Sequence, residues 1–316
     1  MIPIDLITGF LGAGKTTFLL RYAKYLVGRG LKVGILAYDR GAVNVDMPLL
    51  QELRALGCGL EMLAGACDAD CHRRRFRTKL IAMGMSGYDR VLIEPSGVFD
   101  MDEFFDTLNE APLDRWYEAG GVIAVVDAKL EENTAPEEDF FLASQAAGAG
   151  CVVLSRVQLA SPAEIERTVA HLHRAEEAIH SRLTPAASIL VKDWDTLTEA
   201  DFEKLTRCGY YPADYVKTTA EAAFQSLSFL NLTLNRAQLD EKVDRLLTER
   251  RFGKVLRVKG FFPADGRWYQ FNATARDRLV EQVDSTRAAL IVIGCGLDED
   301  AINLLLTGKL PEHHIL

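Results

Sequence analysis

The sequence has no long hydrophobic run, no excess of basic charge and no dense set of cysteines. None of its apolar runs approaches the roughly 18 residues that a membrane span needs, so we expect no contact with a membrane. The net charge of −9 argues against a nucleic-acid-binding protein, because such proteins usually carry a basic surface. The six cysteines are scattered, and no basic segment precedes a long apolar run near the N-terminus. These features predict a cytoplasmic protein with reduced thiols.

Short Val/Ile/Leu runs alternate with helical patterns in the first half of the chain. Strands are expected at residues 2–8, 32–37, 90–94, 122–127 and 151–155, with helices at 16–27 and 72–84. This alternation is typical of an α/β protein whose parallel sheet is covered by helices on both faces. A short apolar run can also be a buried helix, but the glycines and the β-branched residues favour strand.

The pattern changes near residues 206–222, where a second part begins. Strands are expected at residues 227–234, 254–262, 266–272 and 289–293, followed by a helix at 298–305. The turn Pro263-Ala264-Asp265-Gly266 carries an Asp-Gly hairpin signal between two of these strands. We therefore expect a domain at residues 1–210 and a smaller α+β domain at residues 211–316.

The segment from Gly9 to Thr16 fits the spacing G-x-x-x-x-G-K-[ST] of a phosphate-binding loop. Its glycines let backbone N–H groups turn toward phosphate oxygens. Lys15 is expected to reach the β- and γ-phosphates, and the Thr16 hydroxyl to bind Mg²⁺. A glycine-rich turn matches this spacing by chance on the order of once in a hundred chains of this size. The nucleotide contacts expected here are Gly9, Gly12, Ala13, Gly14, Lys15, Thr16 and Thr17.

A second candidate segment is the strand Val91-Leu92-Ile93, which ends in Glu94, with Gly97 three residues later. In P-loop enzymes an acid at this place holds Mg²⁺ directly or through a water molecule, and the glycine amide can contact the γ-phosphate. The structural alternative is an ordinary strand end followed by a turn. The phosphate-binding loop upstream favours the functional interpretation.

Together these motifs resemble the CobW-like branch of the metal-trafficking P-loop GTPases, which is related to the urease and hydrogenase nickel-insertion GTPases. The resemblance rests on Gly-Phe-Leu-Gly-Ala-Gly-Lys-Thr-Thr at 9–17 and Glu-Pro-Ser-Gly at 94–97. Further similar segments lie at 39–46, 125–128 and 255–260. The resemblance implies a P-loop NTPase domain, a CobW-like C-terminal domain, and Mg²⁺-dependent GTP binding with slow hydrolysis. It also implies delivery of a metal or cofactor to a client protein, with Asp46 in the Mg²⁺ and switch region and Asp39 a candidate to position the attacking water.

The loop that reads the nucleotide base differs in sequence from that of the family. The family usually has Asn-Lys-x-Asp after the fifth strand, where this chain has Ser155-Arg156-Val157-Gln158. A carboxylate accepts two N–H bonds from guanine, whereas the Gln158 amide has one acceptor oxygen and one donor group. Arg156 can still stack on a base. GTP is therefore implied by the resemblance, and ATP remains the alternative.

The metal motif departs as well. Where the family has Cys-x-Cys-Cys, this chain has Cys67 and Cys71 at the spacing Cys-x-x-x-Cys. On a helix the two thiols would share one face and could bind Zn²⁺ or another transition metal, such as Cu(I) or the iron of an iron–sulfur centre. The structural alternative is two free thiols. The residues that could complete a ligand set are His72, Asp68, Asp70 and Cys58.

Two weaker signals and two rival functions remain open. The basic run at 72–77 suggests an anion site that reaches a phosphate across a homodimer, or a solvated helix face. His171, His173 and His180 suggest either a metal site or a charged surface helix. The rivals are a nucleotide-binding regulatory module with little turnover, and an ATP-using P-loop enzyme such as a kinase.

Overall fold

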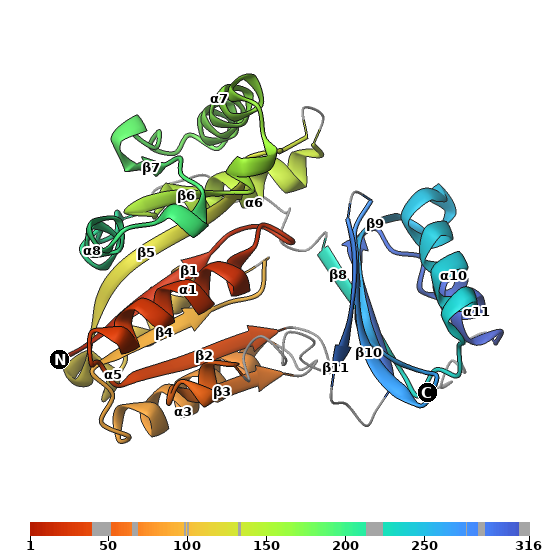
Figure 1. Ribbon diagram of the computed structural model, residues 1–316, viewed down its shortest axis with the longest axis horizontal. Helices are drawn as coiled ribbons and strands as arrows, with labels where there is room; N and C mark the ends of the chain where they lie inside the picture. The colour runs from red at the N-terminus through yellow and green to blue at the C-terminus, as the bar shows by residue number, and fades with distance from the viewer. Residues whose placement is uncertain are drawn as a thin grey trace. The chain divides into compact units, whose positions relative to one another are not determined.

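The chain is described by a computed structural model over residues 1–39, 52–64, 69–97, 99, 101–131, 134–212, 224–275, 277–283 and 288–309 (Figure 1). It folds into two compact units, one holding most of the residues up to Ala220 and the other holding Glu221–Leu316. Each unit is described by itself.

The N-terminal unit is built on a seven-stranded sheet with the order β3-β2-β4-β1-β5-β6-β7. Every pairing within the β2-β4-β1-β5-β6-β7 part of this order is parallel. The strands are β1 (Ile2–Thr8), β2 (Val33–Asp39), β3 (Gly59–Ala64), β4 (Arg90–Glu94), β5 (Tyr117–Asp127), β6 (Cys151–Ser155) and β7 (Ile189–Leu190). Parallel strands place their carboxyl ends at one edge of the sheet, so the segments that follow β1, β4, β5 and β6 meet there.

Helices cover both faces of this sheet, as the apolar runs predict (Figure 1). On one face, α1 (Lys15–Gly28) packs Phe18, Leu19 and Ala23 against buried side chains of the central strands. The other helices of the unit are α3 (Ala69–Gly84), α4 (Met101–Leu108), α5 (Leu113–Trp116), α6 (Pro136–Ala147), α7 (Pro162–Ala178) and α8 (Glu199–Thr206).

A buried charge pair links the middle of β1 to the start of β4. Asp5 of β1 is fully buried and accepts two hydrogen bonds from Arg90 of β4, at 2.6 and 2.8 Å. It also accepts from the Tyr22 hydroxyl at 2.9 Å and from the Gly121 N–H at 2.7 Å. A buried carboxylate needs such partners, because an uncompensated charge in the interior is costly.

The C-terminal unit is a five-stranded antiparallel sheet with the order β11-β10-β9-β12-β8. Its strands are β8 (Phe224–Leu230), β9 (Lys254–Ala264), β10 (Arg267–Ala273), β11 (Arg278–Val283) and β12 (Ala289–Cys295). Two helices, α10 (Arg236–Thr248) and α11 (Glu299–Thr307), lie on one face of the sheet (Figure 1). The expected Asp-Gly hairpin joins β9 to β10, with Asp265 and Gly266 both at positive φ.

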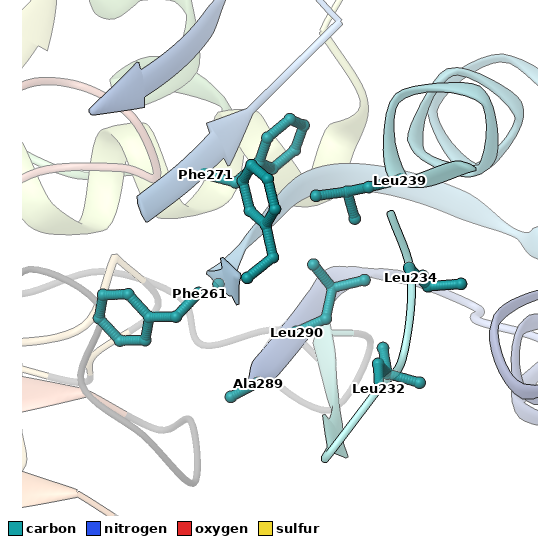
Figure 2. A pocket seen from close by; sticks show the side chains of 9 residues that line it. Leu232, Leu234, Leu239, Phe261, Phe271, Ala289 and Leu290 are labelled. Atoms are coloured by element: carbon teal, nitrogen blue, oxygen red, sulfur yellow. The ribbon is translucent and has the colours of Figure 1, made fainter. Parts of the chain in front are cut away.

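The core of this unit contains a small apolar pocket between α10 and the sheet. Figure 2 shows Leu239 of α10 facing Phe271 and Leu290 across it. The pocket is lined by Leu232, Leu234, Leu239, Gly260, Phe261, Phe262, Phe271, Ala289 and Leu290, and none of these side chains is polar. It therefore offers no chemistry for a catalytic site.

The expected fold class is confirmed: a helix-covered parallel sheet precedes a separate antiparallel α+β domain. The expected strand at 227–234 was placed too late, since β8 spans Phe224–Leu230. The strand expected at 122–127 begins earlier, at Tyr117.

Candidate functional site

The loop between β1 and α1 has the backbone of a phosphate cradle. Gly9, Gly12 and Gly14 all have positive φ, at 140°, 77° and 100°. A Cβ on Gly9 would lie 2.3 Å from the Val125 carbonyl oxygen, so no other residue fits there. The first turn of α1 follows directly and directs its N–H groups toward the loop, which is the geometry that binds phosphate.

Lys15 and Thr16 are anchored at the mouth of this cradle. Lys15 is buried, and its Nζ donates to the carbonyl oxygens of Gly9 at 2.8 Å and Phe10 at 3.2 Å. The Thr16 hydroxyl donates to Glu94 Oε1 at 2.6 Å. The structure thus brings together Thr16 and Glu94, two of the three predicted Mg²⁺ ligands, which lie on different elements. Two adjacent oxygens around Mg²⁺ are about 2.9 Å apart when each lies about 2.05 Å from the metal, so this pair of hard oxygen ligands fits the ion with little movement.

Gly97 closes the cradle from the side of β4. A Cβ on Gly97 would lie 2.7 Å from the Leu11 backbone nitrogen, so this position requires glycine. Its carbonyl oxygen accepts a hydrogen bond of 2.9 Å from Nε2 of Gln145, which is buried on α6. Gln145 was not predicted, because only the fold brings α6 to this loop.

The base-reading loop begins where β6 ends. Ser155 is buried, and its Oγ has no hydrogen-bond partner among the described residues. Arg156 has φ 55° and forms an ion pair with Asp127 at the end of β5. Gln158 is exposed in the short 3₁₀ turn η1 (Val157–Leu159), and we find no side-chain hydrogen bond from it to any residue the structure describes.

Trp194 lies beside the same cradle and was missed from the sequence. It starts the 3₁₀ turn η3 (Trp194–Thr196), and a Cβ on Gly14 would lie 3.3 Å from its ring. Its ring packs edge-on against Phe18 at a centroid distance of 5.4 Å. The Arg21–Asp195 ion pair of 2.6 Å holds the same turn against α1. No sequence motif marks Trp194, because its role depends on a long-range contact.

The cysteine segment is only partly described. Cys67 and Asp68 lie outside the described residues, and α3 begins at Ala69, so a shared helical face for Cys67 and Cys71 stays a prediction. Cys71 is half-buried on α3. His72 is buried, and its ring lies 4.3 Å from that of Tyr38, at the end of β2. No group of three His, Cys, Asp or Glu side chains suited to a metal ion occurs within the described ranges.

The remaining predicted site residues do not gather at the cradle in the part of the chain that the structure describes. Asp46 and the side chain of Asp39 lie outside the part of the chain that the structure describes. In the basic run, Arg73 and Arg77 both pair with Glu110, which supports the interpretation as a helix face. The histidines do not share one helix face, because α7 ends at Ala178 and His180 lies beyond it.

A family model described as the CobW/HypB/UreG nucleotide-binding domain matches residues 3–206. The chain belongs to this family. A second model, the cobalamin synthesis protein cobW C-terminal domain, matches residues 217–309. The two matches confirm the resemblance drawn from the motifs at 9–17 and 94–97.

Characterised relatives of this CobW/HypB/UreG member come from Escherichia coli K12. The chain is 29% identical to the zinc chaperone YeiR over 165 residues, which span 51% of this chain and about half (48%) of YeiR. It is 24% identical to the zinc chaperone YjiA over 97% of this chain and 98% of YjiA. Among solved structures, Zn(II)-bound YjiA GTPase from E. coli aligns with a TM-score of 0.38 at 20% identity, covering 97% of this chain and 98% of that chain.

None of the described helices is both long enough and apolar enough to cross a bilayer.

Proposed function

We propose that the chain is a Mg²⁺-dependent nucleoside triphosphatase that delivers a metal ion to a client protein. GTP is the nucleotide that the family membership favours, and turnover is slow. We place the nucleotide-binding domain at residues 1–210 and the CobW-like domain at 211–316. The observation that carries the proposal is the meeting of Lys15, Thr16 and Glu94 at one cradle.

The side chains of the cradle have separate tasks in this proposal. Lys15 neutralises charge on the β- and γ-phosphates once its Nζ leaves the Gly9 and Phe10 carbonyls. Thr16 and Glu94 would hold Mg²⁺, which would neutralise negative charge on the phosphates. Gly97, fixed by Gln145, offers its amide to the γ-phosphate. Asp39 remains the candidate for positioning the attacking water.

An aromatic cluster is the proposed route from nucleotide to metal. Tyr38 at the end of β2 packs on His72 of α3 and, at 5.7 Å between centroids, on Phe99, two residues beyond Gly97. Phe76 of α3 contacts the same Phe99 at 6.5 Å. A shift of the segment after Gly97 on loss of the γ-phosphate would therefore press on α3, the helix that carries Cys71.

The cargo in this proposal is Zn²⁺ or another transition metal, held by Cys67 and Cys71 with His72 as a third candidate ligand. The names of the E. coli relatives, both zinc chaperones, favour zinc. The proposed partner is a client metalloprotein or another cofactor-dependent protein. For His72 to bind the ion, its ring must leave the Tyr38 contact, which makes it the weakest of the three candidates.

The test is release of inorganic phosphate from GTP with Mg²⁺, compared between the wild-type chain and Lys15→Ala. The proposal predicts slow turnover that needs Mg²⁺ and is lost in the variant. Tight binding with no turnover would instead support a regulatory module. Phosphate transfer to an added acceptor, with no release to water, would indicate a kinase.

A further inference from the structure

We propose that the nucleoside side of the cradle does not select guanine, so that ATP and GTP bind with similar affinity. The inference rests on the proposed nucleotide binding at Gly9 to Thr16 and specifies its substrate class as purine nucleoside triphosphates. Three features of the loops beside the cradle carry it.

The first feature is the residue at the guanine-reading position. The guanine edge presents two N–H donors side by side, from N1 and from the exocyclic amino group. One carboxylate accepts both, whereas an amide has only one acceptor oxygen. Gln158 is exposed and has no hydrogen bond to any other described residue, so nothing there fixes which way its amide points. It can therefore pair with the donor–acceptor edge of adenine as readily as with guanine.

The second feature is that the carboxylates of the neighbouring loops already have hydrogen-bond or ion-pair partners. Asp127 at the end of β5 is paired with Arg156 and also accepts a 2.9 Å hydrogen bond from the Lys129 N–H. Asp193 accepts a 3.0 Å hydrogen bond from the Asp195 N–H, and Asp195 is paired with Arg21. Each of these three acids thus already has a hydrogen-bond or ion-pair partner, and none stands at the position of the missing aspartate, which Gln158 fills.

The third feature is the chemistry of the side chains that lie next to Gly14. A Cβ at Gly14 would lie 3.6 Å from the Ser155 Cβ and 3.3 Å from the Trp194 ring. The atoms of Trp194 nearest that position are the ring carbons Cη2 and Cζ3, which offer no acceptor to the two N–H groups of guanine. Neither Ser155 Oγ nor Trp194 Nε1 has a hydrogen-bond partner among the described residues. Binding energy must then come from the triphosphate, whose contacts with the cradle do not depend on the base.

The experiment is a calorimetric titration of the full-length chain with GTP and with ATP, each with Mg²⁺. We expect dissociation constants within about tenfold of each other, since no charged hydrogen bond distinguishes the bases. Gln158→Asp should then favour GTP over ATP by a further 10- to 100-fold or so, the factor for gaining hydrogen bonds to a charged group. Leu159→Asp is the matched control: it adds the same charge at a neighbouring position that is 62% exposed, and should leave the ratio unchanged.

The outcomes separate this inference from the proposed function. Wild-type GTP binding that is more than about a hundredfold tighter than ATP binding overturns the inference and leaves the triphosphatase proposal intact. A Gln158→Asp ratio equal to that of the wild type also overturns it. If neither nucleotide binds, both proposals fail.

Discussion

Thr16 and Glu94 are 78 positions apart in the chain, and their side-chain oxygens lie 2.6 Å apart. The contact exists because β1 and β4 are adjacent and parallel, so that the segments after both strands begin at the same edge of the sheet. The fold itself thus places the two proposed Mg²⁺ ligands next to each other. A prearranged pair lowers the cost of ordering the site.

Replacing Glu94 with Gln should weaken Mg²⁺ use without unfolding the protein. The variant keeps the shape of the side chain but loses its charge, and a charged hydrogen bond or ligand contributes about 1.5–3 kcal/mol. The Mg²⁺ concentration for half-maximal turnover should rise by about 10- to 100-fold. Glu118→Gln, at an exposed position of β5, is the control and should behave like the wild type. An unchanged Mg²⁺ requirement in Glu94→Gln would remove Glu94 from the site.

Gly9→Ala should abolish nucleotide binding. The substituted Cβ would lie 2.3 Å from the Val125 carbonyl oxygen, at a φ of 140° that L-residues rarely adopt. Gly28→Ala is the matched control, because nothing lies within 4 Å of a Cβ at that helix end. Fluorescence titration with a labelled nucleotide measures both, and circular dichroism checks that each is folded. Normal affinity in a folded Gly9→Ala protein would contradict the cradle geometry.

Arg90→Leu should destabilise the N-terminal unit by about 3–5 kcal/mol, since it leaves the fully buried Asp5 carboxylate without its charge partner. Urea unfolding followed by tryptophan fluorescence provides the measurement. Adding Asp5→Asn to the variant should recover part of the loss, because the uncompensated charge is gone. A double variant no more stable than Arg90→Leu would show that the cost lies in packing instead.

Cys151 and Cys208 should be nearly inert to alkylation at pH 8. Burial raises the pKa of Cys151 to about 11, and burial together with the nearby Cys151 raises the pKa of Cys208 to about 12. At pH 8 a thiol with a pKa of about 11 is about a thousandth ionised, against about a quarter for an ordinary thiol with a pKa of about 8.5. Iodoacetamide labelling read by mass spectrometry should accelerate about tenfold per pH unit from 8 to 10. The urea-unfolded chain supplies the ordinary rates, and equal rates in the folded protein would contradict the burial.

Elements with strong local signals were predictable from the sequence. The run Ile2–Thr8, the glycine spacing at 9–14 and the hairpin at Asp265-Gly266 each carry their structure in a few adjacent residues. The early part of β5 was missed because Gly120 and Gly121 are typical of a loop. The structure gives their reason: a Cβ on Gly120 would lie 2.3 Å from the buried Asp5 carboxylate.

Other features depend on contacts that no local pattern encodes. β7 is only two residues long and is a strand because β6 pairs with it. Apolar and polar residues alternate only weakly along β11, which is a strand because it pairs with β10. Trp194 and Gln145 reach the cradle through the fold, from a turn and a helix far along the chain.

One pair of titrations tests whether nucleotide state controls metal affinity through α3. Zinc binding is measured by calorimetry on the chain saturated with Mg²⁺ and GDP, and on the chain saturated with Mg²⁺ and a non-hydrolysable GTP analogue. We expect zinc affinities that differ by at least about fivefold between the two states, and by linkage the same factor in nucleotide affinity with and without zinc. Cys71→Ala should lose the zinc site while keeping its nucleotide affinity in the absence of zinc. Equal zinc affinities in the two nucleotide states would contradict the coupling.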